Sequence, residues 1–414
     1  MVKRTGVARI YTFTMNAQPS PLTLHPAPTS RQQLTARIKY LAATHGLAVS
    51  AVTTADPFPA VAAHLERHIA AGHVEGMDWF TPERARVSSD IRNLHPTAHS
   101  IISFGLAYWS GPTEKPDDGV PRGRISRYAW GKDYHRVLKR RMKALLADMN
   151  DLLGRELDVR ILVDTARVVE RAVAARAGLG WYGKNANLIV PGRGSWVLLG
   201  EMVTDLDLEP DEPLDRNCGR CTICIDRCPT GAIVEPYTIH APSCISYLTI
   251  ELRDAIPPEL RPQMGDWVYG CDVCQEVCPY TGAAEVVNDP DMQPASLDNA
   301  FPSLSWLLTM TPEEFGATYF GTPVPRTKRR GLARNAAVAL GNIGTEDDVP
   351  ALARALATHD EPLVRGHAAW ALGAIGGLAA RATLDRHRTS ASDDYVASEI
   401  NLALERMDSR RTLS

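Results

Sequence analysis

All eight cysteines of this 414-residue chain lie between residues 218 and 278, in two runs whose spacing suits iron–sulfur clusters. The first run has the pattern C-x2-C-x2-C-x3-C-P, in which three thiolates bind one four-iron cluster and the fourth reaches a second cluster. The second run, C-x2-C-x3-C-P, lacks a first member, and Cys244 stands ahead of it to supply that thiolate. The spacing therefore predicts two 4Fe-4S clusters. One is bound by Cys218, Cys221, Cys224 and Cys278, and the other by Cys228, Cys244, Cys271 and Cys274.

Disulfide bonds and zinc are the two other uses of so many cysteines. Disulfide frameworks are typical of short secreted chains, which a chain of 414 residues is not. Zinc sites more often use two C-x2-C pairs separated by a longer loop than a tight triple run followed by Cys-Pro. The spacing therefore favours clusters over both alternatives.

Composition indicates a globular protein of two or three domains. Hydrophobic residues make up 44% of the sequence, and a net charge of −3 gives no overall attraction to nucleic acid or anionic lipid. No apolar stretch is long enough to span a membrane. Residues 1–29 resemble a loose extension more than a signal peptide, because Arg9 interrupts the apolar stretch, and Met15 is an alternative start. We expect a cytoplasmic protein with no membrane partner.

Apolar periodicity predicts the elements that hold the polar residues in place. Helices are expected at residues 30–46, 58–71 and 135–152. Strands are expected at residues 47–53, 100–108 and 157–164. Ser30 is a plausible N-cap for the first helix. The third helix has one apolar and one basic face, and such a basic face either binds a polyanion or is solvated.

Two further segments carry polar groups that chemistry could use. Asp164 ends the third strand and leads into a helix with Glu170 and Arg171 in its early turns. A carboxylate there either faces a crevice or caps the helix. Residues 178–187 contain three glycines and Lys184 without the spacing of a P-loop. We expect either a loop whose backbone a flat, amide-bearing ligand can approach or a tight helix-to-strand turn.

The C-terminal part contains a repeat, since residues 335–344 recur 32 positions later as 367–376. Repeated helix pairs of this period are HEAT-like, and each needs its neighbour to bury its apolar face. Five cations precede the first repeat and either grip phosphates or form a solvated run. They are Arg326, Lys328, Arg329, Arg330 and Arg334.

The expected fold is an α+β catalytic core with a ferredoxin-like two-cluster module, followed by an all-α HEAT-like repeat domain. The expected boundaries are 1–29 for the extension, 30–209 for the catalytic domain, 210–290 for the cluster module and 291–414 for the helical domain.

Several segments in chain order resemble epoxyqueuosine reductase, and the resemblance covers about residues 30–380. They are Arg127-Tyr-Ala-x-Gly-x-Asp-Tyr-His135, Val163-Asp164-Thr165 with Glu170-Arg171, Gly180-Trp-x-Gly-Lys-Asn185, residues 244–251, the second cysteine run, and residues 321–335. The resemblance implies a cobalamin-dependent enzyme with two 4Fe-4S clusters. It would reduce epoxyqueuosine to queuosine at the wobble position of tRNA anticodons, the last step of queuosine biosynthesis.

The resemblance also implies roles for individual residues. The family's proton donor maps to Asp164, and this sequence has Arg167 where the family usually has proline. The residues expected nearest the cobalamin are Arg127, His135, Asp164, Lys184, Asn185 and Ser246. The expected tRNA contacts are Arg326, Lys328, Arg329, Arg330 and Arg334. Asp133 and His135 begin a cobalamin-ligating motif, Asp-x-His-x-x-Gly, but Leu138 replaces its glycine, so ligation of that kind is not expected.

The expected partners are tRNA and an electron donor that the sequence does not identify, and the expected state is a monomer. Two other functions stay open at this point. A dehalogenase-like reductase of a small molecule fits the cofactors, but the repeats and the basic run argue against it. A non-enzymatic electron carrier would not need some two hundred residues ahead of the clusters.

Overall fold

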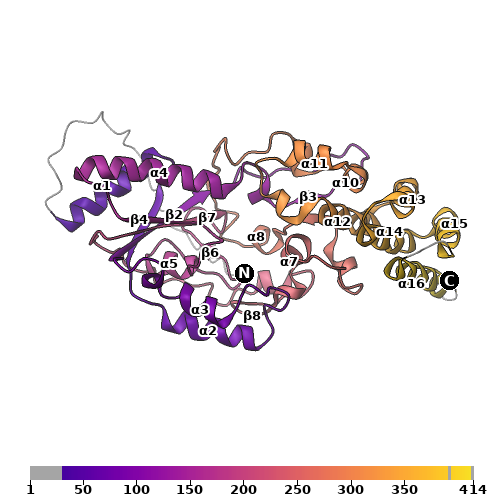
Figure 1. Cartoon of the computed structure of the whole chain (residues 1–414), viewed down its shortest axis with the longest axis horizontal. Coiled ribbons are helices and arrows are strands. Elements are labelled where there is room, and N and C mark those ends of the chain that lie inside the picture. Colours follow the sequence, from indigo (N-terminus) through magenta and orange to yellow (C-terminus); the bar gives the residue numbers. More distant parts are fainter. Residues whose placement is uncertain (1–29, 390–392, 412–414) are drawn as a thin grey trace, which may run out of the picture.

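The computed structural model describes residues 30–389 and 393–411 as an elongated molecule with a β-sheet at one end and stacked helices at the other (Figure 1). The expected extension, residues 1–29 with Met15, lies outside the described residues. Among the helices of the described ranges, none is long and apolar enough to cross a membrane.

A four-stranded antiparallel sheet forms the core of the first end, with the strand order β1-β2-β7-β4. Its strands are β1 (Val49–Thr54), β2 (Ser100–Ala107), β7 (Val197–Thr204) and β4 (Val159–Leu162). Two helices cover one face (Figure 1), namely α1 (Arg31–Thr44) and α4 (Tyr134–Leu153). The other face carries α2 (Pro59–Ala70), α3 (Pro82–Ser88) and α5 (Glu170–Arg176). Because both faces are covered, every residue of the central strand β2 is buried.

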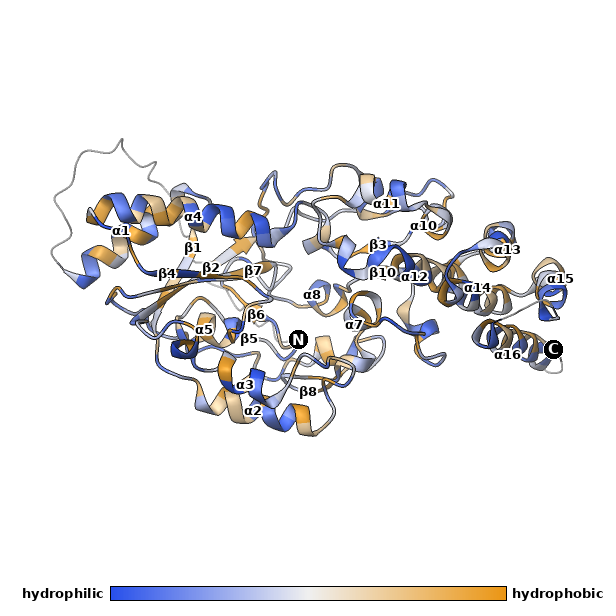
Figure 2. Ribbon diagram, viewed as in Figure 1, coloured by the Kyte–Doolittle hydropathy of each residue, from blue (hydrophilic) through white to orange (hydrophobic). Residues whose placement is uncertain are grey.

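The helices on the first face follow the apolar pattern of the sequence. Ser30 caps α1, as predicted, by accepting a hydrogen bond from the backbone N–H of Gln33. The predicted apolar face of α4 is buried at His135, Leu138, Met142, Leu145 and Met149. Figure 2 shows hydrophobic and hydrophilic residues alternating along both helices. On the basic face of α4, Arg140 and Arg141 form salt bridges with Asp291. Part of this face therefore binds the segment that follows the last cysteine, Cys278.

Of the alternatives left open for the two polar segments, the structure excludes one and confirms another. Strand β4 ends at Leu162, and α5 begins only at Glu170 with Val169 at its N-cap position. Asp164 therefore lies in the loop between them, and the helix-cap interpretation of Asp164 is wrong. In residues 178–187 the chain turns at Gly178 (φ +77°) and enters a hairpin of β5 (Trp181–Tyr182) and β6 (Leu188–Ile189), so the helix-to-strand turn is present.

The cysteine segment lies between the sheet and the stacked helices (Figure 1). Each cysteine run contains one helical turn, α6 (Ile223–Asp226) or α8 (Val273–Glu276), and α7 (Ile245–Ile250) follows Cys244. Two small sheets frame it, β8 (Ile233–Glu235) with β9 (Thr238–Ile239), and β10 (Trp267–Tyr269) with β3 (Arg124–Ile125). Three short helices lead onward, α9 (Leu297–Ala300), α10 (Leu304–Thr309) and α11 (Pro312–Tyr319).

The predicted repeats form the second end of the molecule. Their helices are α12 (Lys328–Ile343), α13 (Val349–Thr358), α14 (Pro362–Ile375), α15 (Gly377–Arg388) and α16 (Asp394–Arg411). Equivalent residues 32 positions apart, Leu340, Leu372 and Leu404, are buried between them. A Cβ at Gly341 would lie 3.0 Å from the backbone of Ala371, and the equivalent Gly373 meets Ala403 in the same way. Glycine at this repeat position therefore allows α12, α14 and α16 to pack closely.

Candidate active site and cluster pockets

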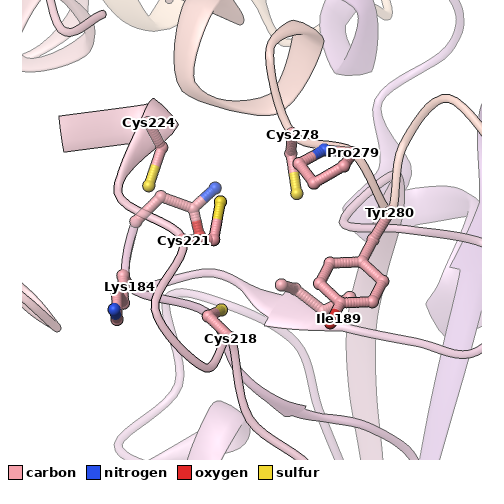
Figure 3. A pocket seen from close by; sticks show the side chains of 9 residues that line it. Lys184, Ile189, Cys218, Cys221, Cys224, Cys278, Pro279 and Tyr280 are labelled. Carbon is pink, nitrogen blue, oxygen red and sulfur yellow. The ribbon is translucent and has the colours of Figure 1, made fainter. Parts of the chain in front are cut away.

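One set of four predicted cluster ligands lines a single pocket. Cys218, Cys221, Cys224 and Cys278 surround a space of about 300 Å³ beside the β5–β6 hairpin. Figure 3 shows their sulfur atoms pointing into this space from both cysteine runs. The structure thus brings together the three thiols of the first run and the last thiol of the second.

The other four cysteines, Cys228, Cys244, Cys271 and Cys274, form the second set. Cys274 interacts electrostatically with Cys244 and Cys228, and Cys271 interacts with Cys274 and Cys244. Burial raises the pKa of the Cys244, Cys271 and Cys274 thiols. Thiolates at these positions would therefore need a compensating cation, which a bound iron cluster provides.

The spacing of these thiols suits a cluster better than a single ion. Within residues 30–389 and 393–411, no three Cys, His, Asp or Glu side chains are close enough to hold one metal ion. In a four-iron cluster each thiolate binds a different iron atom, so the thiolates stand further apart. The eight thiols therefore supply the ligands that two four-iron clusters need.

A polar site surrounds Asp164 at the end of β4. Asp164 adopts a left-handed backbone conformation (φ +48°), which turns its carboxylate toward the start of α4 and toward Arg326. Its Oδ2 accepts a hydrogen bond from the Tyr134 hydroxyl at 2.7 Å and lies 3.1 Å from His135 Nε2. Arg326 donates to the same oxygen at 3.2 Å. The adjacent Tyr134 and His135 and the distant Arg326 thus converge on one carboxylate oxygen.

These contacts set where protons reside in the site. Burial alone would raise the pKa of Asp164, but the hydrogen bonds from His135 and Tyr134 and the charge of Arg326 hold it well below its usual value. For His135, burial lowers the pKa, yet the bonds to Asp133 and Asp164 outweigh it and raise the net pKa. These contacts favour the carboxylate form of Asp164 in this arrangement. The raised pKa of His135 favours its protonated form.

Sequence reasoning singled out Glu170 beside Asp164 but missed Glu201, a second carboxyl of this region. Glu170 accepts a hydrogen bond from the backbone N–H of Asp164 at 3.2 Å, and burial, offset by Arg171 and reinforced by Asp164, raises the pKa of Glu170 to about 7. Glu201 of β7 is fully buried, and burial and the charge of Glu170 raise its pKa. Ser103 donates to Glu201 Oε1 at 3.5 Å, while Oε2 has no partner in the described chain. The sequence feature that could have pointed to Glu201 is its position as the single acid within the apolar segment of residues 197–204.

The residues expected near a cobalamin fall into separate places. His135 lies in the Asp164 site, while Lys184 donates to the carbonyl of Gly219 at 2.8 Å and Asn185 to that of Cys274 at 3.3 Å. The backbone N–H of Ser246 faces the sulfur of Cys244. Lys184 therefore lies beside the first cluster set, and Asn185 and Ser246 lie beside residues of the second.

Arg127 packs against aromatic side chains in this structure. Its guanidinium lies between the rings of Trp109 and Trp130, 4.5 and 4.6 Å from their centres, and donates to the carbonyl of Gly111 at 3.0 Å. Only 7% of the residue is exposed. In this arrangement the Arg127 side chain contacts the protein core, and its expected contact with the cofactor stays a prediction.

The expected basic patch is also divided by the fold. Arg326 turns into the Asp164 site, and Arg334 is fully buried, where it donates to the carbonyls of Leu248 and Leu252 at 2.6 and 2.9 Å. The expectation of a tRNA contact is wrong for Arg334, because no phosphate can reach its guanidinium. The rest of the run lies nearer the surface. Lys328 is exposed, Arg329 pairs with Asp360, and Arg330 lies 3.8 Å from Glu361.

Comparison with known proteins agrees with this architecture. A model for a 4Fe-4S double cluster binding domain matches residues 217–281, and a model for HEAT repeats matches residues 328–405. A model described as epoxyqueuosine reductase QueG, DUF1730, matches residues 89–165. The segment with the eight cysteines is therefore one that binds two 4Fe-4S clusters.

Whole-chain relatives carry the same name. An epoxyqueuosine reductase of Staphylococcus aureus is 35% identical over 92% of this chain and 98% of its own. A solved epoxyqueuosine reductase with an epoxyqueuosine-modified tRNA-Tyr stem loop is 33% identical, with a TM-score of 0.85 over 92% of this chain and all of its own. A Bacillus subtilis epoxyqueuosine reductase, with its catalytic aspartate loop swung out of the active site, gives a TM-score of 0.84 at 33% identity over 91% of this chain and all of its own. The protein belongs to the epoxyqueuosine reductase family of oxidoreductases.

Proposed function

We propose that this protein reduces epoxyqueuosine to queuosine at the wobble position of tRNA anticodons, using two 4Fe-4S clusters and cobalamin. The observation that carries the proposal is the Asp164 site, where a carboxylate, an imidazole, a phenol and a guanidinium meet in a chain that also binds two clusters. The solved relative with an epoxyqueuosine-modified tRNA stem loop supports tRNA as the substrate.

The reaction determines what the protein must provide. Converting an epoxide to an alkene breaks two carbon–oxygen bonds and releases the oxygen as water, which consumes two electrons and two protons. The bound clusters supply electrons singly, and cobalamin would supply the metal centre that acts on the substrate. The chain must orient the nucleoside, exclude water and place a proton at the departing oxygen.

Polar groups along the hairpin and the cysteine segment fit the amide-bearing edge of a corrin. Lys184, Asn185 and Ser246 lie there, and the nearby Trp181 carries a buried indole N–H that has no hydrogen-bond partner in the described residues. Buried donors of this kind normally have a partner. We propose that these residues hold the cobalamin and that the eight cysteines divide into the two cluster sets given above.

Asp164 is the proposed proton donor, and its loop must move before it can act. As a carboxylate bound to Arg326 it has no proton to give, whereas away from Arg326 in a water-excluded cleft its pKa rises. His135 Nε2, 3.1 Å from Asp164 Oδ2, is the proposed source of that proton. The swung-out aspartate loop of the Bacillus subtilis relative supports such a movement for residues 163–169 here.

The tRNA would extend toward the repeats. The exposed Lys328 and the half-buried Arg330 at the start of α12 are the cations of the basic run that remain placed to meet phosphate. Arg329 contributes less, because its guanidinium is already paired with Asp360.

Asp164→Asn tests the catalytic assignment. The amide keeps the shape of the side chain but has no acidic proton, so we expect single-turnover conversion to fall at least about a hundredfold. Iron content, bound cobalamin and tRNA affinity should stay at the level of the unmodified protein. Conversion within a fewfold of normal would contradict the role of Asp164 and move the proton source to His135 or to water.

A further inference from the structure

A second set of side chains adjoins the Asp164 loop at Thr165. Arg84, on α3, donates a hydrogen bond from Nη2 to the carbonyl of Thr165 at 3.2 Å. The same guanidinium lies 4.8 Å from the ring centre of Trp79, in the loop between α2 and α3. Trp79 is thus fixed, through one side chain, to the residue that follows Asp164.

Trp79 is unusually open for a tryptophan. It is 48% exposed, although Arg84 covers part of its ring and Phe80 packs edge to face at 5.4 Å. A large ring that is held in place but uncovered is a stacking platform for an unpaired nucleobase, and guanidinium planes serve the same purpose. Its position beside the catalytic loop suits a base next to the reacting nucleoside.

The charge of this region is also uncompensated. Arg167 is exposed and lies two positions after Thr165, whose carbonyl Arg84 binds. Burial and the positive charge of Arg167 lower the pKa of Arg84, and the opposing influence is that of Asp164, which already pairs with Arg326. The salt bridges of the described chain include neither Arg84 nor Arg167, whereas Arg86 on the same helix pairs with Glu66. An anion placed between Arg84 and Arg167 would relieve their repulsion.

We propose that Trp79, Arg84 and Arg167 bind one nucleotide of the anticodon loop next to the modified nucleoside, with the base stacked on Trp79 and its phosphate held by the two guanidiniums. This inference rests on the proposed function and adds the residues that would grip the RNA at the catalytic loop.

The test measures binding of a labelled anticodon stem loop to the holoenzyme by fluorescence anisotropy at several salt concentrations. We expect Trp79→Ala to weaken binding about tenfold, within the range for loss of one stacked base, and Trp79→Phe to restore most of it. Arg167→Gln should reduce the slope of log affinity against log salt by about 0.7, the value for one phosphate of a single strand. For both weakened variants, KM for the stem loop should rise by more than kcat falls.

Arg86→Gln is the matched control, because Arg86 lies on the same helix and is paired with Glu66. It should leave affinity and salt slope within about twofold of the unmodified enzyme. If Trp79→Ala and Arg167→Gln behave like this control while the enzyme still converts its substrate, the nucleotide site is refuted and the proposed function stands. If the unmodified holoenzyme neither binds nor converts the stem loop, both are refuted.

Discussion

Replacing Arg326 by glutamine should shift the pH dependence of catalysis to higher pH. Arg326 lies 3.2 Å from Asp164 Oδ2 and 2.7 Å from His135 Nε2, so its charge disfavours a proton on either group. Without that charge, both groups keep a proton to higher pH. The falling alkaline limb of the single-turnover rate should therefore move upward.

The size of the shift follows from the geometry. Two unit charges 3.2 Å apart interact with about 5 kcal/mol at an effective dielectric constant of about 20. The side chains of Arg326 and Asp164 are 31% and 38% exposed, so screening by water reduces the net interaction to about 1 to 2 kcal/mol. We therefore expect the alkaline limb to move by about one pH unit.

The assay is single-turnover conversion of an epoxyqueuosine-containing stem loop by the loaded enzyme, measured across pH. Arg326→Lys is the control, since it keeps the positive charge and should keep the limb near its original position. Iron content and RNA affinity show whether either variant is otherwise intact. A limb that stays in place or moves downward in an intact Arg326→Gln enzyme would refute the proposed control of the proton by Arg326.

Two further predictions concern the clusters and the buried acid. Anaerobically reconstituted protein should hold about eight irons, and Cys244→Ala should lower this toward about four, because a missing thiolate leaves one cluster corner open; bound zinc in place of iron would contradict the cluster assignment. Burial raises the pKa of Glu201 well above 4.5. Below pH 4.5 the side chain is neutral in both the folded and the unfolded protein, so its ionisation does not affect the free energy of unfolding. As the pH rises toward the raised pKa, only the unfolded protein ionises, and the folded protein is progressively destabilised. Glu201→Gln should thus gain stability relative to the unmodified protein as pH increases, in urea unfolding at several pH values, and a constant difference would show that Glu201 does not titrate as inferred.

The features that the sequence predicted correctly are those that depend on residues close together in the chain. The cysteine spacing is local, and the fold places the predicted first set of ligands around one pocket. The alternation of apolar residues along α4 and the 32-residue repeat are also local, and both are confirmed by the buried residues they specify. Helix capping at Ser30 depends on three neighbouring residues and was equally predictable.

The Asp164 site depends on long-range contacts that no local pattern records. Arg326 is separated from Asp164 by 162 positions, and it stands in a cationic run that looks like a surface patch. Arg334 of the same run lies eight positions later, on α12, and is fully buried, where it donates to carbonyls of the segment after Cys244. The ionised state of Asp164 follows from those same contacts, so the sequence could suggest the residue but not its charge.

The most direct measurement is nucleoside analysis of tRNA after reaction with the anaerobically purified protein, loaded with iron and cobalamin and supplied with an artificial reductant. The substrate is tRNA that carries epoxyqueuosine, and mass spectrometry of its digested nucleosides follows the loss of one oxygen. We predict stoichiometric conversion of epoxyqueuosine to queuosine that requires both clusters and cobalamin. Unchanged epoxyqueuosine with a fully loaded, RNA-binding protein would contradict the proposed function.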